Sequence, residues 1–309
     1  MKEAQVEVVP APPLDVARGK LTGIRHQSNL SDYIALTKPR LNFLVVVTSA
    51  AGYYLGSIAS INLWDMAQAV VGTALVASGA AVLNQVYERD TDAMMRRTLA
   101  RPLPDHRVTA GDATIFGLTL SIAGIALLAF GANTLAALLA LATLVVYLVI
   151  YTPMKRRSSA ATLVGAIPGA LPPLIGWAAA HGAVTAGGWT LFAIVFLWQI
   201  PHFMAIAWMY RDDYRSAGFP MLPVIEPDGR RTGSHALWFA VALLPVSLAP
   251  TFVGLSGWTY FAIALLLGTA LLVLSIRFAA TRSETSARQL FFGSITYLPL
   301  IWAAMILNH

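Results

Sequence analysis

The chain of 309 residues contains no cysteine, and only 12% of its residues carry a charged side chain. The absence of thiols excludes disulfide bonds, thiolate metal sites and cysteine nucleophiles. Charge is scarce because 57% of the residues are hydrophobic, and the mean hydropathy of +0.65 is far above the range of soluble proteins. The sequence is therefore apolar throughout, with its charges gathered in a few places.

Apolar segments long enough to cross a membrane recur along the chain. A hydrocarbon core about 30 Å thick needs roughly 20 residues as a helix. Alternating ten-residue segments of the barrel type do not occur, so helices must satisfy the backbone hydrogen bonds within the membrane. The sequence predicts an all-α polytopic membrane protein. Its nine predicted spans are residues 41–60, 64–86, 112–131, 134–152, 161–181, 189–210, 235–254, 258–279 and 288–307.

The basic residues predict how these spans are oriented. All 21 lysines and arginines precede the first span or lie in, or at the borders of, the connections after spans two, four, six and eight. The positive-inside rule then places the N-terminus in the cytoplasm and the C-terminus on the opposite side of a bacterial-type inner membrane. A net charge of +6 on one face suits anionic lipid headgroups or an anionic substrate, and gives no indication of nucleic acid.

The chain is predicted to form one membrane domain. Residues 1–30 are polar, contain proline and lack the apolar core of a signal peptide, so we expect a disordered cytoplasmic tail. Residues 31–309 form the membrane domain. Its longest cytoplasmic connections follow spans two and six and hold acidic clusters, so we expect these two connections to form a cytoplasmic cap.

The first acidic cluster begins where the second span ends. If that helix continues past the span, Asn84, Glu88 and Asp92 are spaced i, i+4, i+8 and share one face, whereas Asp90 points elsewhere. Three oxygen-bearing side chains on one face repel each other unless a cation lies between them. Mg²⁺ prefers such ligands and commonly bridges one or two carboxylates to phosphate oxygens. The pattern therefore predicts a magnesium site.

Two arginines follow this cluster, Arg97 and Arg101. Guanidinium groups bind phosphate oxygens through two hydrogen bonds, so these residues are candidates for holding a phosphorylated substrate. The alternative interpretation is a solvated loop at the membrane surface in which the acids pair with the arginines.

A second polar cluster lies towards the end of span six. At 100° per residue, Gln199, His202 and Asp213 fall on one side of a straight helix, although Pro201 could kink it. Polar side chains within spans usually face a bundle interior or a water-filled cavity. The alternatives are that His202 is a hydrogen-bonded packing residue and that Asp213 is a loop charge paired with an arginine.

Taken together, these motifs carry a resemblance to a known family. The chain resembles the UbiA superfamily of intramembrane prenyltransferases over roughly residues 30–305. The spacing of Asn84, Glu88 and Asp92 is typical of the whole superfamily, and the longer motifs resemble its haem-modifying branch. These motifs are "RTLARPL", "YTPMKRR", "GALPPLIGW", "WQIPHF" and "DYRSAGFPMLP".

The resemblance implies nine transmembrane helices around a central cavity, with the acidic motifs near its cytoplasmic end. It implies that Mg²⁺ holds the diphosphate of farnesyl diphosphate and that the farnesyl group is transferred to a vinyl group of haem B. Water addition then completes a hydroxyethylfarnesyl group. Membrane lipids are the surroundings, and a haem A synthase or a terminal oxidase assembly system is the expected recipient of the product.

The resemblance also assigns roles to residues. The catalytic and metal-binding positions are Asn84, Glu88, Asp92 and Asp213. The positions for substrate are Arg97, Arg101, Tyr151, Lys155, Arg156, Gln199, His202, Arg211 and Tyr214. The chain departs from the family pattern after "KRR", where Ser158 and Ala161 stand in place of a Thr and an Asn. It also lacks the pair of aspartates four residues apart that is typical of quinone prenyltransferases, which weakens a two-magnesium arrangement.

Two other functions remain open at this point. A quinone-type aromatic prenyltransferase belongs to the same superfamily and is disfavoured by the missing aspartate pair. A proton-coupled transporter would have ionisable residues near the middle of several spans and discontinuous helices. The acids of this chain gather at one membrane face instead, although Pro168, Pro172 and Pro173 are potential helix breaks.

Overall fold

The computed structural model describes residues 29–58 and 60–309, and every regular element in that range is helical. Of the predicted tail, only Asn29 and Leu30 lie within the described residues, where they begin the first helix. The elements are α2 (Leu30–Leu36), α3 (Pro39–Gly56), α4 (Leu63–Asp92), α5 (Ala110–Gly131), α6 (Thr134–Val145), η1 (Val146–Tyr151), α7 (Thr152–Met154), α8 (Ala161–His181), α9 (Ala186–Met209), α10 (Arg211–Ser216), α11 (Leu222–Ile225), α12 (Arg230–Phe252), α13 (Trp258–Thr281) and α14 (Glu284–Leu307).

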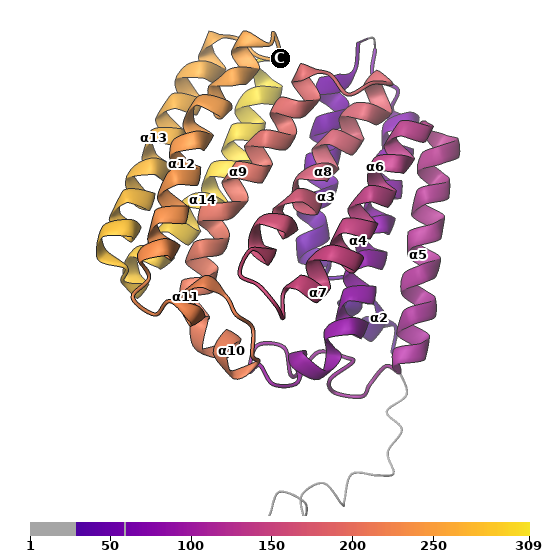
Figure 1. Ribbon diagram of the computed structural model, residues 1–309. Helices are drawn as coiled ribbons and strands as arrows, with labels where there is room; N and C mark the ends of the chain where they lie inside the picture. Colours follow the sequence, from indigo (N-terminus) through magenta and orange to yellow (C-terminus); the bar gives the residue numbers. More distant parts are fainter. Residues whose placement is uncertain (1–28, 59) are drawn as a thin grey trace, which may run out of the picture.

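The long helices form the bundle that the hydropathy pattern predicts (Figure 1). In the described range, eight helical segments are long and apolar enough to cross a membrane, with α6, η1 and α7 counting as one segment. The first predicted span corresponds to α3, an 18-residue helix that is not among the eight. The protein is a multi-pass membrane protein, and the exact count of nine spans stays a prediction.

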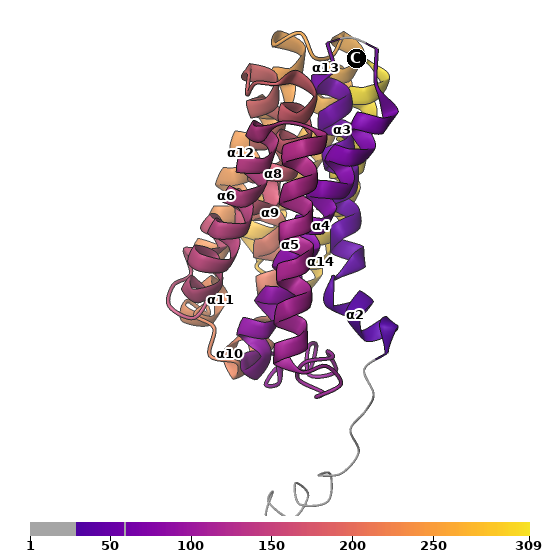
Figure 2. The same ribbon diagram turned by 90° about the vertical axis from the view of Figure 1, so that its right-hand side faces the viewer.

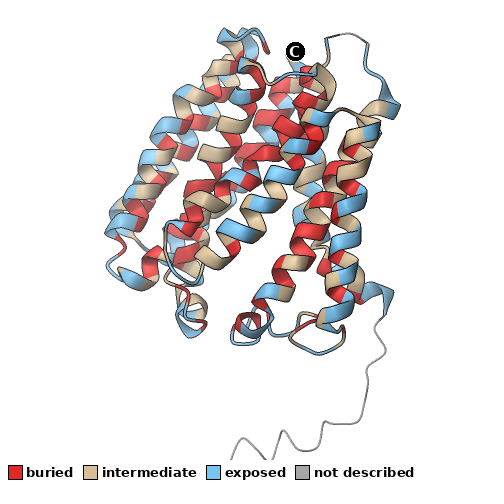
Figure 3. Cartoon of the chain, turned by 45° about the vertical axis from the view of Figure 1, so that its right-hand side comes forward, coloured by how far each residue is buried: buried red, intermediate tan, exposed pale blue. Residues whose placement is uncertain are grey.

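Helices α8 and α9 lie at the centre of the bundle. In each of them, 61% of the most apolar window is buried within the protein, compared with 17% for the segment Thr134–Met154. Figure 3 shows the same contrast as buried residues on inward faces and exposed stripes on the outer helices. Exposed apolar residues on outer helices are expected in a membrane, because lipid rather than water covers them.

The short helices gather at one end of the bundle. In Figure 1, α2, α7, α10 and α11 lie at the end opposite the C-terminus, and Figure 2 shows the same end from the side. This is the end that carries the basic connections after α4, α7, α9 and α13. Charge and irregular backbone are therefore concentrated together, outside the apolar part of the bundle.

Close contact between α3 and α8 depends on two glycines. A Cβ atom added at Gly52 would lie 2.1 Å from the carbonyl oxygen of Pro173, and one added at Gly176 would lie 2.0 Å from that of Ser49. Small residues allow membrane helices to approach until their backbones touch, which increases dispersion contacts. The absence of side chains at these two positions therefore fixes α3 against the central helix α8.

Candidate active site

Helix α4 continues past the apolar span to Asp92 and presents the first acidic cluster on one buried face. Asn84, Glu88 and Asp92 are 0%, 6% and 1% exposed, whereas the side chain of Asp90 is 87% exposed. The predicted sharing of a face by the first three residues is confirmed, and so is the different direction of Asp90. Burial of two carboxylates so close together requires cationic partners.

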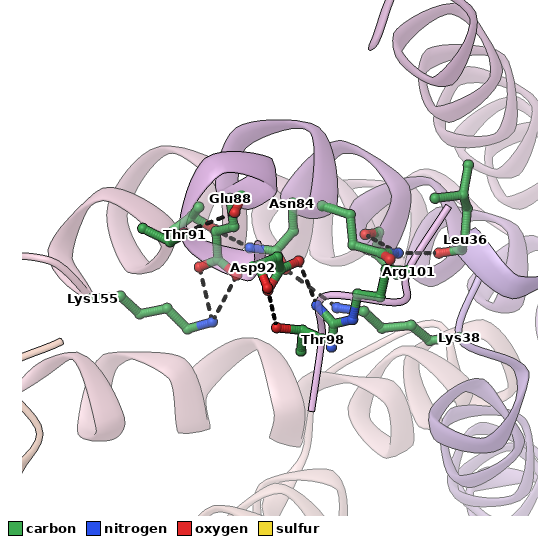
Figure 4. Close-up of polar contacts among 12 residues, drawn as sticks. Leu36, Lys38, Asn84, Glu88, Thr91, Asp92, Thr98, Arg101 and Lys155 are labelled. Carbon is green, nitrogen blue, oxygen red and sulfur yellow. Dashed lines mark hydrogen bonds and ion pairs between the residues drawn. The ribbon is translucent and has the colours of Figure 1, made fainter. Parts of the chain in front are cut away.

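The partner of Glu88 is Lys155, which follows the short helix α7. The Nζ atom of Lys155 donates to Oε1 and Oε2 of Glu88 at 3.0 and 3.2 Å (Figure 4). It also lies 4.8 Å from the ring centroid of Tyr151. Burial opposes the charge of Lys155, but the neighbouring Tyr151 and Glu88 hold its pKa well above the ordinary value. Lys155 is therefore a fixed cation at the end of the bundle.

The partner of Asp92 is Arg101. One guanidinium nitrogen of Arg101 lies 2.6 Å from Oδ2 of Asp92. The intervening turn is held by the hydroxyl of Thr98, which donates to the backbone carbonyl of Asp92 at 2.7 Å. The two acids of α4 thus point to two different cations, as Figure 4 shows. A charge-assisted pair of this kind orders the loop that follows α4.

Asn84 has partners that the sequence did not reveal. Its Oδ1 atom accepts from Nζ of Lys38 at 3.3 Å and from the hydroxyl of Tyr147 at 3.5 Å. Its Nδ2 atom donates to the hydroxyl of Thr152 at 3.1 Å. Lys38 adopts a left-handed backbone conformation, with φ 52° and ψ 61°, which is uncommon for a residue other than glycine.

Burial lowers the pKa of Lys38 to about 7, and the nearby positive charges of Arg101 and Lys155 contribute to the decrease. A lone lysine before a proline, ahead of the first span, is too common a pattern to single out from sequence. Its unusual backbone conformation is what directs it towards Asn84.

A π-helical segment places the aromatic residues of the site. The fourth span was predicted as residues 134–152, and its helix is interrupted by η1 (Val146–Tyr151), which contains Tyr147 and Tyr151. The hydroxyl of Thr152 donates to the carbonyl of Tyr147, five residues earlier, at 2.7 Å. Such segments are rare and occur frequently at functional sites. Here the segment brings Tyr147, Tyr151 and Thr152 against the polar face of α4.

The connections after α4 and α9 contact each other. Met95, Ala217 and Phe219 form a small buried cluster, with Tyr214 and Met221 packed against it. The guanidinium of Arg97 also lies over the ring of Tyr210, 5.6 Å from its centroid. The two connections that hold the acidic motifs therefore pack together, which a cap formed by both of them requires. That they cover a central cavity stays a prediction.

The second acidic motif does not continue α9. That helix ends at Met209, and Asp213 lies in the separate short helix α10. The straight-helix geometry that placed Asp213 on one face with His202 therefore does not apply. Asp213 and Tyr214 are partly exposed, and Arg156 is exposed. Arg211 donates to the carbonyl of Trp208 at 2.8 Å and covers the ring of that residue.

Gln199 and His202 lie further up α9, within the apolar part of the bundle. Gln199 is buried, and its amide group donates to the carbonyls of Ala166 and Val195 at 3.2 and 3.1 Å. The Nδ1 atom of His202 lies 2.8 Å from the hydroxyl oxygen of Ser294 on α14. Both side chains are held in place by hydrogen bonds, and contact with substrate stays a prediction for both.

The donor set at α4 fits Mg²⁺. No group of three or more His, Cys, Asp or Glu side chains with metal-binding geometry occurs among the described residues. Magnesium does not require one, because it commonly keeps several waters and binds through one or two carboxylates and the phosphates of its substrate. Glu88 and Asp92 supply two carboxylates, and Asn84 adds an amide oxygen.

Comparison with curated proteins gives close relatives over nearly the whole chain. A protein of Solibacter usitatus named protoheme IX farnesyltransferase is 48% identical over 289 residues, which cover 91% of this chain and 99% of the relative. A protein of Opitutus terrae with the same name is 46% identical, covering 91% and 96%. The resemblance noted in the motifs therefore extends through all the helices that form the site.

Solved structures share the fold. A digeranylgeranylglyceryl phosphate synthase superposes with a TM-score of 0.77 at 16% identity, covering 90% of this chain and 98% of that chain. A UbiA homolog from Archaeoglobus fulgidus bound to GPP and Mg²⁺ superposes with a TM-score of 0.65 at 15% identity, covering 89% and 99%. A profile of the UbiA prenyltransferase family matches residues 45–298. The chain therefore belongs to the UbiA prenyltransferase family.

Proposed function

We propose that this protein is a haem O synthase. It transfers the farnesyl group of farnesyl diphosphate to a vinyl group of protoheme IX (haem B), with addition of water. The observation that carries the proposal is the 48% and 46% identity, over 91% of the chain, to proteins named protoheme IX farnesyltransferase. The buried acid and cation pairs at the end of α4 are the chemistry that such a reaction requires.

The reaction breaks the bond between C1 of the farnesyl group and the diphosphate oxygen, and the electron pair leaves with diphosphate. The terminal vinyl carbon of haem then bonds to C1. The positive charge is then on the vinyl carbon attached to the porphyrin ring. The oxygen of water bonds to this carbon, and a proton is released. The products are haem O, diphosphate and one proton, so atoms and charge balance.

The residues at the end of α4 would stabilise the diphosphate leaving group by holding Mg²⁺. Bound Mg²⁺ supplies positive charge that neutralises the diphosphate as the bond breaks. Asn84, Glu88 and Asp92 would hold the metal, together with Asp213 from the neighbouring connection. Support comes from the burial of the first three residues and from the packing of the two connections against each other.

The cations that neutralise the acids would also bind the diphosphate. Arg101 and Lys155 lie against Asp92 and Glu88, and Arg97 and Arg156 follow on the same end of the bundle. Fixed guanidinium and ammonium groups stabilise growing negative charge without reorganisation, which is usually the largest contribution to catalysis. Lys38 lies beside this group, in contact with Asn84.

The surroundings favour prenyl transfer over transport. The long apolar helices exclude water from an allylic cation, and Tyr147 and Tyr151 supply aromatic faces beside the site. Helix α8 runs without interruption from Ala161 to His181 despite its three prolines, so it gives no discontinuous helix of the kind transporters use. A transporter is therefore not favoured, and the names of the relatives do not favour a quinone prenyltransferase.

The site lies at the basic end of the bundle, and we propose that this end faces the cytoplasm of a bacterial cell across its inner membrane. Farnesyl diphosphate would then reach the site from the cytoplasm. The product would pass to a haem A synthase or to a terminal oxidase assembly system. The distribution of lysine and arginine supports this orientation.

The test is an assay with purified protein, haem B, farnesyl diphosphate and Mg²⁺, followed by mass spectrometry of the extracted haem. We expect haem carrying one added hydroxyethylfarnesyl group. Glu88→Gln and Asp92→Asn should each abolish the product, and Asp90→Asn, which changes an exposed acid of the same helix, should leave it unchanged. An aromatic acid offered in place of haem should not be prenylated. Absence of farnesylated haem with the wild-type protein would overturn the proposal.

A further inference from the structure

The side chain of His202 stacks on two aromatic rings. Its imidazole stacks on Trp198 of α9, with ring centroids 5.1 Å apart and planes 18° apart. It also stacks on Phe291 of α14, at 5.1 Å and 21°. The indole nitrogen of Trp198 donates to the backbone carbonyl of Ser294 at 2.7 Å, which ties the two helices together at this level.

The hydrogen bonds around Ser294 determine which nitrogen of His202 carries the proton. Ser294 is fully buried, and its hydroxyl donates to the carbonyl of Phe291 at 2.7 Å. A hydroxyl has a single proton to donate. The same oxygen lies 2.8 Å from Nδ1 of His202, so towards His202 it accepts. Nδ1 therefore carries the proton, and Nε2 of the neutral ring has a free lone pair.

The Nε2 atom is open to its surroundings. It makes no hydrogen bond with any residue in the described part of the chain. In that part, the buried side-chain polar atoms without a partner belong to Trp177, Thr232, Tyr297 and Trp302, and not to His202. Nε2 is thus an unpaired acceptor that is accessible from outside the packed core.

We propose that Nε2 of His202 coordinates the iron of the haem substrate and that Ser294 is the positioning residue that fixes its tautomer. This inference rests on the proposed function, which supplies the haem. A neutral imidazole held by a hydrogen bond from its other nitrogen is the usual form of a histidine that binds haem iron.

The alternative partner on haem is a propionate group. A carboxylate needs a hydrogen-bond donor, and Nε2 in this tautomer has none. No carboxylate among the described residues lies within ion-pair distance of His202 to hold the ring in its charged form. Coordination at the iron would hold the porphyrin at its centre, so the vinyl groups at its edge would remain free to react.

The experiment is a titration of the full-length protein with ferric haem B, followed by absorption and electron paramagnetic resonance spectroscopy in the absence of farnesyl diphosphate. The wild-type protein should show the spectrum of histidine-coordinated haem. His202→Ala should lose that spectrum and weaken haem binding about tenfold or more, and added imidazole should restore the spectrum. His181→Ala is the matched control, since His181 also stacks on a tryptophan, Trp177, and should leave the spectrum unchanged.

Ser294→Ala tests the tautomer separately. It removes the acceptor for Nδ1 and should weaken haem binding about tenfold while the coordination spectrum remains, and Ser294→Thr should recover most of the affinity. The proposal is overturned if His202→Ala keeps the wild-type spectrum. It is also overturned if His181→Ala, and not His202→Ala, loses the spectrum of histidine-coordinated haem. If His202→Ala does not fold, His202→Asn, which is closer in size, replaces it with the same two outcomes.

Haem binding and turnover are measured independently. If the wild-type protein farnesylates haem and His202→Ala keeps the wild-type spectrum, the proposed function stands and iron coordination by His202 is refuted. A wild-type protein that binds haem through His202 and forms no farnesylated product supports the coordination and refutes the proposed function.

Discussion

The Nζ atom of Lys155 lies 3.0 Å from Oε1 of Glu88, although 67 positions separate the two residues in the chain. The carboxylate is 6% exposed and the lysine side chain 23% exposed. The pair joins the end of α4 to the end of α7, two elements that carry residues of the candidate site.

Replacing Lys155 by methionine should destabilise the protein. The change leaves the buried carboxylate of Glu88 without its cation, at a cost of about 3 kcal/mol, the low end for breaking a buried ion pair. Denaturant unfolding in detergent measures the change. Arg157→Met, which alters an exposed basic residue of the same connection, is the control. The double variant Glu88→Gln with Lys155→Met should be more stable than Lys155→Met alone, and equal stabilities would contradict a coupled pair.

Replacing Arg101 by lysine should weaken the binding of prenyl diphosphate more than it slows the chemical step. The charge is kept, but the planar guanidinium that contacts Asp92 and is proposed to bind phosphate oxygens is lost. We expect the KM for farnesyl diphosphate to rise about tenfold, with kcat reduced less. Steady-state kinetics at saturating haem separate the two effects. An unchanged KM for Arg101→Lys and for Arg101→Met alike would show that Arg101 serves the fold alone.

Removal of divalent metal should abolish farnesyl transfer. Chelation with EDTA takes away the charge that stabilises the diphosphate leaving group, and excess Mg²⁺ should restore the full rate. Glu88→Asp would shorten the reach of one proposed metal ligand, so the Mg²⁺ concentration for half-maximal rate should rise. Asp90→Glu is the matched control on the exposed side of α4. Full activity in EDTA would rule out the metal site.

Replacing Gly176 by alanine should destabilise the contact between α3 and α8. The new Cβ atom would lie 2.0 Å from the carbonyl oxygen of Ser49, a backbone atom that can move only with its helix. We expect a loss of about 1–3 kcal/mol, typical of overpacking. Thermal unfolding in detergent measures it. Gly111→Ala is the control, because the nearest atom to its added Cβ is 3.8 Å away, and an equal loss at both positions would contradict the packing argument.

The sequence predicted the part of the site that lies on one regular helix. The spacing of Asn84, Glu88 and Asp92 follows from 3.6 residues per turn, so their shared face required no tertiary information. The positions of eight apolar spans were also predictable, because membrane thickness sets their length. The predicted first span, residues 41–60, corresponds to α3, which contains Arg40 and Asn42 and is not among the eight apolar segments, so a ninth crossing stays a prediction.

The remaining contacts depend on irregular backbone. Lys38 reaches Asn84 from a left-handed residue, and Tyr147 reaches it from a π-helical turn. Neither conformation has a local sequence signal, and Tyr147 lies in an apolar run where packing is the ordinary expectation for an aromatic residue. Asp213 was expected to continue the face of α9, but the helix ends at Met209. Helix periodicity cannot be extrapolated past such an end.

The π-helical segment Val146–Tyr151 has a consequence for how this site can change during evolution. A π turn contains about one residue more than an α turn, so this segment accommodates an extra residue while the helix after it keeps its direction. If the same residues formed a regular α-helix, everything after them would rotate by about 100°, and Thr152 and Lys155 would turn away from Asn84 and Glu88 with every side chain chemically intact. The site therefore depends on the conformation of this turn as well as on the identity of its residues, and substitutions between 146 and 151 that favour a regular α-helix would inactivate it without touching a site residue.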